Sequence, residues 1–138
     1  MTLYIIDASA MGPLIIPDEA DELIDTLPDI LYSDEAMVPL HWRVEVANLA
    51  RMAIRKRRLT EPLLIDAFAA LSVFDLILDD QTDALAWTTI LVLAGKHNLT
   101  AYDAAYLELA MRTSRTIVTN DKALIMAAVR ENVGVLSK

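Results

Sequence analysis

The sequence contains no cysteine and only three glycines among its 138 residues. Without cysteine there is no disulfide framework, no thiolate zinc site and no cysteine nucleophile. So few glycines leave no glycine-rich phosphate loop. Long apolar runs are also missing: the longest, 84–95, contains two threonines and is shorter than the ~20 residues that a bilayer requires. We therefore expect no membrane span, no signal peptide and a cytoplasmic location.

The composition indicates a single folded domain over 1–138. Hydrophobic residues make up 55% of the chain and charged residues 23%, which excludes a disordered protein. Acids outnumber bases by twenty to twelve, giving a net charge of −8. Taken alone, this charge argues against a protein that holds nucleic acid over its whole surface.

Short apolar runs alternate along the chain with longer helical segments. The predicted strands are 3–6, 36–38, 74–78, 116–118 and 133–136. The predicted helices are 9–16, 18–27 (interrupted by Pro28), 40–57, one beginning after Thr60, 82–97, 100–113 and 122–131. This alternation predicts an α/β fold, with a parallel sheet of four to five strands flanked on both faces by helices in a three-layer sandwich.

Four acids fall at equivalent places in this pattern, at strand ends and helix starts: Asp7, Glu45, Asp103 and Asp121. In a parallel sheet the carboxyl ends of the strands and the starts of the following helices share one edge. That edge is where such folds bind their ligands. Four carboxylates from distant parts of the chain are therefore expected to converge there.

Each acid also has a simpler interpretation as a helix cap. Acids in a first helical turn are favoured by about 0.3–1 kcal/mol through the helix dipole. The pair Thr100 and Asp103 fits a capping box, and Asp121 is placed to cap the last helix. Asp7 is harder to explain in this way, because it closes a wholly apolar strand where an unpartnered carboxylate is costly.

Converging carboxylates repel one another unless a cation lies between them. Oxygen donors without histidine or cysteine suit Mg²⁺ or Mn²⁺ better than Zn²⁺. The chemistry that such a site performs best is hydrolysis of phosphodiesters. The sequence thus predicts a metal site with this chemistry.

Four local sequences resemble the PIN-domain family, and within it the VapC-type ribonuclease toxins of toxin–antitoxin pairs. They are YIIDASA at 4–10, VEVANL at 44–49, LTAYDAAYLELA at 99–110 and TNDK at 119–122. The four blocks occur in the family's order and span nearly the whole chain. The resemblance implies a PIN-like sandwich, a Mg²⁺-dependent endoribonuclease site, homodimerisation and neutralisation by a cognate antitoxin.

The resemblance also assigns roles to residues. Asp7, Glu45, Asp103 and Asp121 match the family's acidic quartet, with Asp7 and Asp103 as direct metal ligands. Glu45 and Asp121 would complete the site through water or a second ion. Ser9 and Thr119 match the hydroxyl residues that accompany the first and fourth acids.

Five of the twelve bases lie between residues 51 and 58. At 100° per residue, Arg51, Arg55 and Arg58 share one flank of the helix that carries Glu45. One interpretation is a strip of RNA phosphate contacts leading to the site. The other is a solvated helix end, where cations interact favourably with the dipole.

Two further functions are compatible with an acidic edge on a parallel sheet. The first is a Mg²⁺-binding phosphoacceptor receiver domain, in which Asp79 or Asp80 after the third strand would accept the phosphoryl group. The second is a non-catalytic PIN module that acts only through a partner. The lone acid after the first strand disfavours the former, and the complete quartet disfavours the latter.

Overall fold

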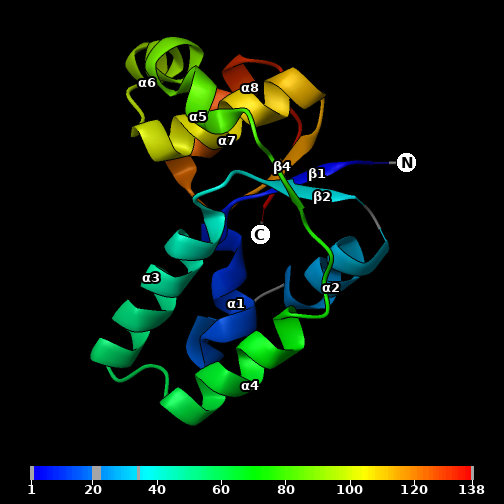
Figure 1. Ribbon diagram of the computed structural model, residues 1–138, viewed down its shortest axis with the longest axis vertical. Coiled ribbons are helices and arrows are strands. Elements are labelled where there is room, and N and C mark those ends of the chain that lie inside the picture. The colour runs from blue at the N-terminus through cyan, green and yellow to red at the C-terminus, as the bar shows by residue number, and fades with distance from the viewer. Residues whose placement is uncertain (1, 20–22, 34, 138) are drawn as a thin grey trace.

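The computed structural model describes residues 2–19, 23–33 and 35–137. Its strands form one parallel sheet in the order β3-β2-β1-β4-β5 (Figure 1). The strands are β1 (Tyr4–Ile6), β2 (Ala36–Val38), β3 (Ile77–Leu78), β4 (Thr116–Val118) and β5 (Val135–Leu136). This confirms the predicted α/β class and the parallel sheet, although the last strand is shorter than predicted.

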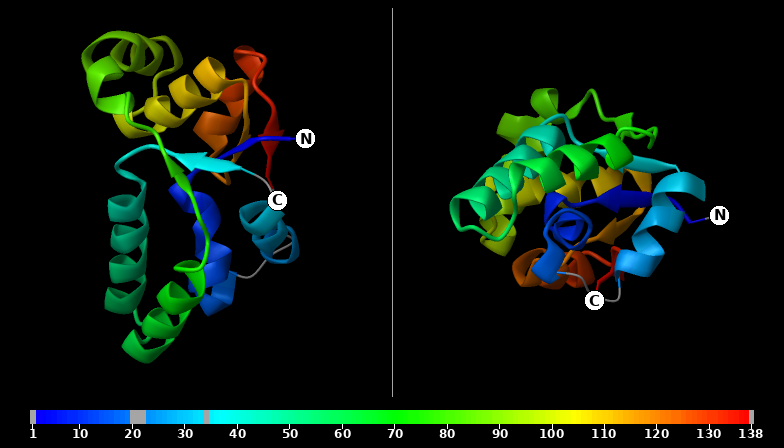
Figure 2. Two further views of the ribbon diagram at one scale, coloured as in Figure 1. Left: turned by 45° about the vertical axis from the view of Figure 1, so that its right-hand side comes forward. Right: turned by 90° about the horizontal axis from the view of Figure 1, so that it is seen from below.

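Helices cover both faces of the sheet. Figures 1 and 2 show α1 to α4 on one side and α5 to α8 on the other. The first group comprises η1 (Ala8–Met11), α1 (Gly12–Ile15), η2 (Pro17–Glu19), α2 (Leu23–Ser33), α3 (Trp42–Arg55) and α4 (Glu61–Leu71). The second comprises α5 (Thr82–Leu85), η3 (Ala86–Ile90), α6 (Leu91–His97), α7 (Ala101–Thr113) and α8 (Lys122–Arg130). None of the described helices is long and apolar enough to cross a bilayer.

The core is centred on β1, β4 and α7. The two strands are buried on both faces, since the consecutive residues Ile5 and Ile6 and the consecutive residues Ile117 and Val118 are all 0% exposed. In α7, seven consecutive residues from Ala104 to Ala110 are buried, which is two helical turns covered on every side. This helix lies between the sheet and its helical neighbours, so the acid in its first turn has a rigid support.

The prediction that Pro28 interrupts a helix over 18–27 is wrong. The chain forms the short η2 turn first, and α2 then continues through Pro28 to Ser33. Residues 20–22 of the predicted helix lie outside the described residues. The proline costs one backbone hydrogen bond. Packing offsets that cost, because Leu27, Ile30 and Leu31 from the same helix are all buried in the core.

Three further features differ from those predicted. Strand β3 is limited to Ile77–Leu78, which pair with Met37 and Val38 of β2. The predicted helix over 82–97 is helical throughout, but Ala86–Ile90 widens into a π-helical turn. Helix α3 ends at Arg55, and Arg57 adopts the left-handed conformation with φ of 60°.

The strand order contains one switch point. Strand β1 pairs with β2 on one side and with β4 on the other, so the direction of winding reverses between β1 and β4. In parallel α/β sheets the crevice at the carboxyl end of such a pair is the usual ligand site. Here it is flanked by the chain segments that follow Ile6 and Val118.

Candidate active site

Asp7 follows β1 at the carboxyl edge of the sheet and is 3% exposed. Two hydroxyls donate to its Oδ2 atom, Ser9 Oγ at 2.6 Å and Thr119 Oγ1 at 2.7 Å. Burial raises the pKa of Asp7; the hydrogen bonds from Ser9 and Thr119 oppose that rise, and the charge of Glu45 adds to it. The hydroxyls therefore orient a carboxyl group that burial alone would favour in its protonated form.

Hydrogen bonds through the Thr119 hydroxyl link Asp121 to Asp7. The fully buried hydroxyl of Thr119 accepts the backbone N–H of Asp121 at 3.0 Å while donating to Asp7. Asp121 also caps α8, since its Oδ1 accepts the N–H of Leu124 at 3.0 Å. The predicted cap is confirmed. Among the described residues, Oδ1 is the only carboxylate oxygen of Asp121 that accepts a hydrogen bond.

Glu45 reaches the site from the first turn of α3, where two side chains meet its Oε1 atom. The hydroxyl of Tyr106 donates to Oε1 at 2.9 Å, and Nε2 of His41 lies 2.9 Å from the same oxygen. The His41 ring also makes edge contacts with Tyr106 and with Tyr102, at centroid distances of 5.5 and 5.6 Å. Glu45 is thus held by the N-cap residue of its own helix and by a side chain from α7.

Asp103 stands in the first turn of α7, where Thr100 caps the helix. The Thr100 hydroxyl accepts the Asp103 N–H at 3.1 Å, as the capping-box interpretation predicts. Burial raises the pKa of Asp103 to about 6, with further increases from the charges of Asp121, Asp7 and Glu45. The charges of the other three predicted acids thus all reach Asp103.

The donors of this cluster suit a hard cation, but they do not form a closed cage. Mutual repulsion of four carboxylates is the electrostatic condition that Mg²⁺ or Mn²⁺ relieves. Among the described residues, no three histidine or acidic side chains stand together at metal-ligand spacing. This openness is compatible with Mg²⁺, which usually keeps several waters and takes only one or two carboxylates from a protein.

The three arginines predicted as one RNA-binding strip are not equivalent. Arg51 and Arg55 lie on α3, and Arg51 is exposed, with only a long 3.9 Å contact to Glu61. Arg58 lies beyond the end of the helix, so its assignment to the same flank is wrong. Its guanidinium donates to Asp18 at 2.6 and 3.0 Å and to Glu19 at 2.8 Å.

Asp79, considered as a phosphoacceptor, is instead part of a buried ionic network. It is 4% exposed, and Arg112 donates to both of its carboxylate oxygens, at 3.1 and 2.9 Å. The hydroxyl of Thr82 adds a bond of 2.7 Å to Oδ2. Burial opposes ionisation, but Arg112 and Thr82 hold the pKa of Asp79 below its usual value. A carboxylate so fully engaged is poorly placed to accept a phosphoryl group.

Two residues that contact Glu45 were not among the predicted site residues. Tyr106 follows Asp103 by three residues and His41 precedes Glu45 by four, so each shares a helix face with an acid. That spacing is the signal that would have found them. It also describes many core residues, and the contact of both with one Glu45 oxygen depends on how α3 and α7 come together.

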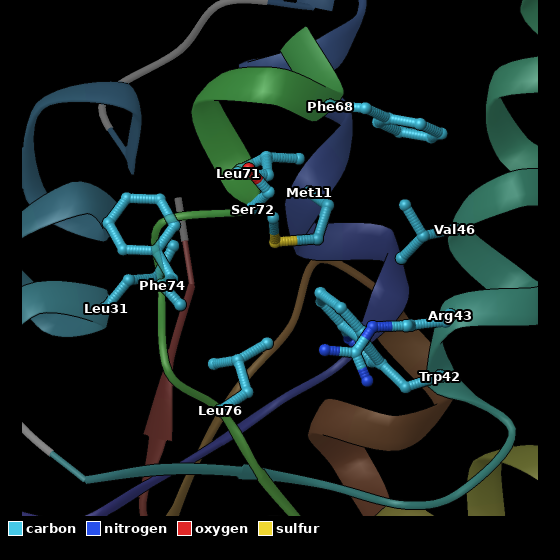
Figure 3. A pocket seen from close by; sticks show the side chains of 10 residues that line it. All are labelled: Met11, Leu31, Trp42, Arg43, Val46, Phe68, Leu71, Ser72, Phe74 and Leu76. Atoms are coloured by element: carbon cyan, nitrogen blue, oxygen red, sulfur yellow. The ribbon is translucent and has the colours of Figure 1, made fainter.

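An apolar pocket of about 330 Å³ opens between η1, α2, α3, α4 and the segment that leads into β3 (Figure 3). Trp42 and Val46 line it from the helix that carries Glu45, and Arg43 is the one cation among the described residues that line it. The other lining residues are Met11, Leu31, Phe68, Leu71, Ser72, Phe74 and Leu76. The pocket is therefore distinct from the acidic edge but shares α3 with it.

No protein-family model and no curated protein matches the chain. Solved structures do. PAE2754 from Pyrobaculum aerophilum is 20% identical with a TM-score of 0.66, over 99% of this chain and 89% of that one. VapBC2 from Rickettsia felis, solved with a promoter DNA fragment, is 15% identical with a TM-score of 0.63, over 99% of both chains. FitAcB from Neisseria gonorrhoeae is 20% identical with a TM-score of 0.60, over 96% of both. At these identities the likeness is one of fold, and it confirms the predicted PIN-like architecture.

Proposed function

We propose that this chain is a metal-dependent endoribonuclease that acts as the toxin of a type II toxin–antitoxin pair. One observation carries the proposal: burial and then the charges of three acids from other segments, Asp121, Asp7 and Glu45, raise the pKa of Asp103. The four sequence blocks that resemble VapC-type toxins support it. The likeness in fold to VapBC2 and FitAcB supports it as well.

Asp7 and Asp103 would hold Mg²⁺ or Mn²⁺ directly, and Glu45 and Asp121 would act through water or a second ion. When bound, the ion lowers the pKa of a coordinated water and stabilises negative charge on the leaving oxygen. The chain's own contribution is to fix its carboxylates in place. Ser9 orients Asp7, and Thr119 links it to the backbone of Asp121.

The proposed substrate is RNA, bound through local positive charge rather than through the whole surface. Arg51 and Arg55 are exposed along α3, and Glu45 lies nearer the start of the same helix. Their guanidinium groups would contact phosphates on either side of the cleaved bond. Arg58 would not contact RNA, because its guanidinium is already bound by Asp18 and Glu19.

The proposed partners are a cognate antitoxin and a second copy of the chain. An antitoxin segment with apolar and basic side chains would suit the pocket beside α3 and the acidic edge respectively. For the homodimer, the surface of α5 to α6 offers Trp87, Leu91 and Val92, which are 90%, 59% and 68% exposed. Co-purification with the product of a neighbouring reading frame and light scattering of the isolated chain test these two proposals.

The activity is tested with purified protein and RNA, with and without Mg²⁺. We expect cleavage that EDTA abolishes and that Mn²⁺ restores. Asp7→Asn should reduce the rate by about 100-fold or more, because it removes a charge aimed at the reacting centre while keeping the Ser9 and Thr119 bonds. The matched control is Asp66→Asn, an exposed acid on α4. Equal activity of Asp7→Asn and the wild type would contradict the proposal.

Toxicity in cells provides a second measurement. Induced expression of the wild-type chain should arrest growth, and the ends of cellular RNA should then show new cleavage sites. Asp7→Asn should do neither. A chain that is toxic through binding alone, as a non-catalytic PIN module would be, would remain toxic with this substitution and produce no new RNA ends.

A further inference from the structure

Tyr106 occupies a central place among the acids of the site. It is 0% exposed, and its helix carries Asp103 three residues earlier. Its hydroxyl donates to Glu45 Oε1 across a sequence separation of 61 residues. The charges of Asp7 and Glu45 both act on this hydroxyl, so it lies near these two acids. A third acid, Asp103, is carried by the same helix as Tyr106.

The Tyr106 hydroxyl donates to Glu45 Oε1 at a distance of 2.9 Å. A donor fixed in this way holds an ionised carboxylate in one orientation, and such charge-assisted bonds are roughly twice as strong as neutral ones.

Packing alone does not require this hydroxyl. A phenylalanine would fill the same space in α7, whose neighbouring residues are buried on every side. The hydroxyl adds a specific link between α7 and α3, the two helices that carry Asp103 and Glu45. His41 contacts the same Oε1 atom from the N-cap of α3, whereas the Tyr106 bond links Glu45 to the other helix.

We propose that Tyr106 is a positioning residue that holds the Glu45 carboxylate toward the other three acids, so that the affinity of the site for a divalent cation depends on its hydroxyl. This inference rests on the proposed function, because it takes the acidic cluster to be a metal site. Groups that orient metal ligands from behind typically change metal affinity by 10–100-fold when they are removed.

The test is calorimetric titration of the metal-free protein with Mn²⁺. We expect Tyr106→Phe to weaken Mn²⁺ binding by about 10-fold or more. Tyr32→Phe is the matched control, because Tyr32 is 70% exposed and lies on α2, and it should bind as the wild type does. Equal affinity of Tyr106→Phe and the wild type would overturn the inference alone. A wild type that binds no Mn²⁺ would overturn the proposed metal site together with it.

A double-mutant cycle identifies the residue through which Tyr106 acts. In a Glu45→Ala background, Tyr106→Phe should cause no further loss of Mn²⁺ affinity. An undiminished loss in that background would show that the hydroxyl does not act through Glu45, and the inference would be wrong.

One measurement needs no variant at Tyr106. In the wild-type protein the ring resonances of Tyr106 should shift during a Mg²⁺ titration, while those of Tyr32 should not. Mg²⁺ binding that leaves the Tyr106 resonances unchanged would overturn the inference even if the Tyr106→Phe chain did not fold.

Discussion

Asp103 carries the carboxyl group of the site whose ionisation is easiest to observe. Its pKa is raised to about 6 by burial and by the charges of Asp121, Asp7 and Glu45. Bringing these acids together without a cation therefore costs the folded protein free energy at neutral pH. A cation bound among these acids would relieve the same repulsion.

The raised pKa of Asp103 predicts how the stability of the metal-free protein depends on pH. The unfolded carboxyl group ionises near 3.8, whereas the folded one keeps its proton until about pH 6. Stability from this group is therefore lost as pH rises from about 4 to about 6.5. Urea unfolding with EDTA should show that the wild type loses about 1 kcal/mol relative to Asp103→Asn over this range, after discounting for solvent screening.

Asp103→Asn is the reference because asparagine does not titrate and keeps the backbone bond to Thr100. Other acids with lowered pKa values, such as Asp79, are present in both proteins and cancel in the difference. A wild type whose stability follows that of Asp103→Asn at every pH would show that Asp103 ionises normally.

At the scale of elements, the ionic network of Arg112, Asp79 and Glu108 links α7 to the segment after β3. Arg112 donates to both carboxylate oxygens of Asp79 and to both of Glu108, the latter at 2.8 and 3.1 Å. The two acids are 4% and 3% exposed. Since α7 also carries Asp103 and Tyr106, this network contributes to holding the site from the far end of the helix.

Arg112→Met should destabilise the protein by about 3–5 kcal/mol, because it leaves two buried carboxylates without a counter-charge. Chemical denaturation measures the loss. Arg51→Met is the matched control, since the 3.9 Å contact of Arg51 with Glu61 is exposed and worth at most about 1 kcal/mol. Adding Asp79→Asn and Glu108→Gln to Arg112→Met should recover part of the loss. A small effect of Arg112→Met alone would mean that water reaches the network.

The elements that local sequence predicted well are those whose signals are local. Thr100 and Asp121 cap α7 and α8 where expected, because a cap depends on residues three positions apart. Pro28 misled the prediction because its effect is decided by packing: Leu27 and Ile30 from the same helix are buried in the core. The π-helical turn at Ala86–Ile90 had no local signal that distinguishes it from an ordinary helix.

The same distinction holds at the site. The four acids could be found because strand ends and helix starts share an edge in any parallel sheet. Tyr106 and His41 could not be assigned, because their common contact with Glu45 requires the relative placement of α3 and α7. Arg58 was misplaced because the helix ends at Arg55, and its true partner Asp18 lies 40 residues away.

At the scale of the whole molecule, the charge of −8 is not a uniform property. The charges of Asp121, Asp7 and Glu45 all act on Asp103, so a divalent cation bound by these acids should stabilise the folded chain as a whole. Binding at 100 times the dissociation constant contributes about 2.7 kcal/mol. Thermal unfolding should show a midpoint that rises with Mn²⁺ in the wild type and in Asp66→Asn, but not in Asp7→Asn. A rise of equal size in Asp7→Asn would place the cation elsewhere.

The positive charge is local as well, and this predicts how RNA cleavage depends on salt. If Arg51 and Arg55 contact phosphates, each releases about 0.7 counterion from a single strand on binding. A plot of log kcat/KM against log salt concentration, measured at saturating Mg²⁺, should therefore be shallower by about 1.4 in the double variant Arg51→Gln, Arg55→Gln. Arg58→Gln is the matched control. The guanidinium of Arg58 is already bound by Asp18 and Glu19, so it should not contact RNA phosphates and its loss should leave the slope unchanged. Equal slopes in the double variant and the wild type would show that RNA approaches the acids along another surface. A shallower slope in Arg58→Gln would show that RNA displaces Asp18 and Glu19 from this arginine.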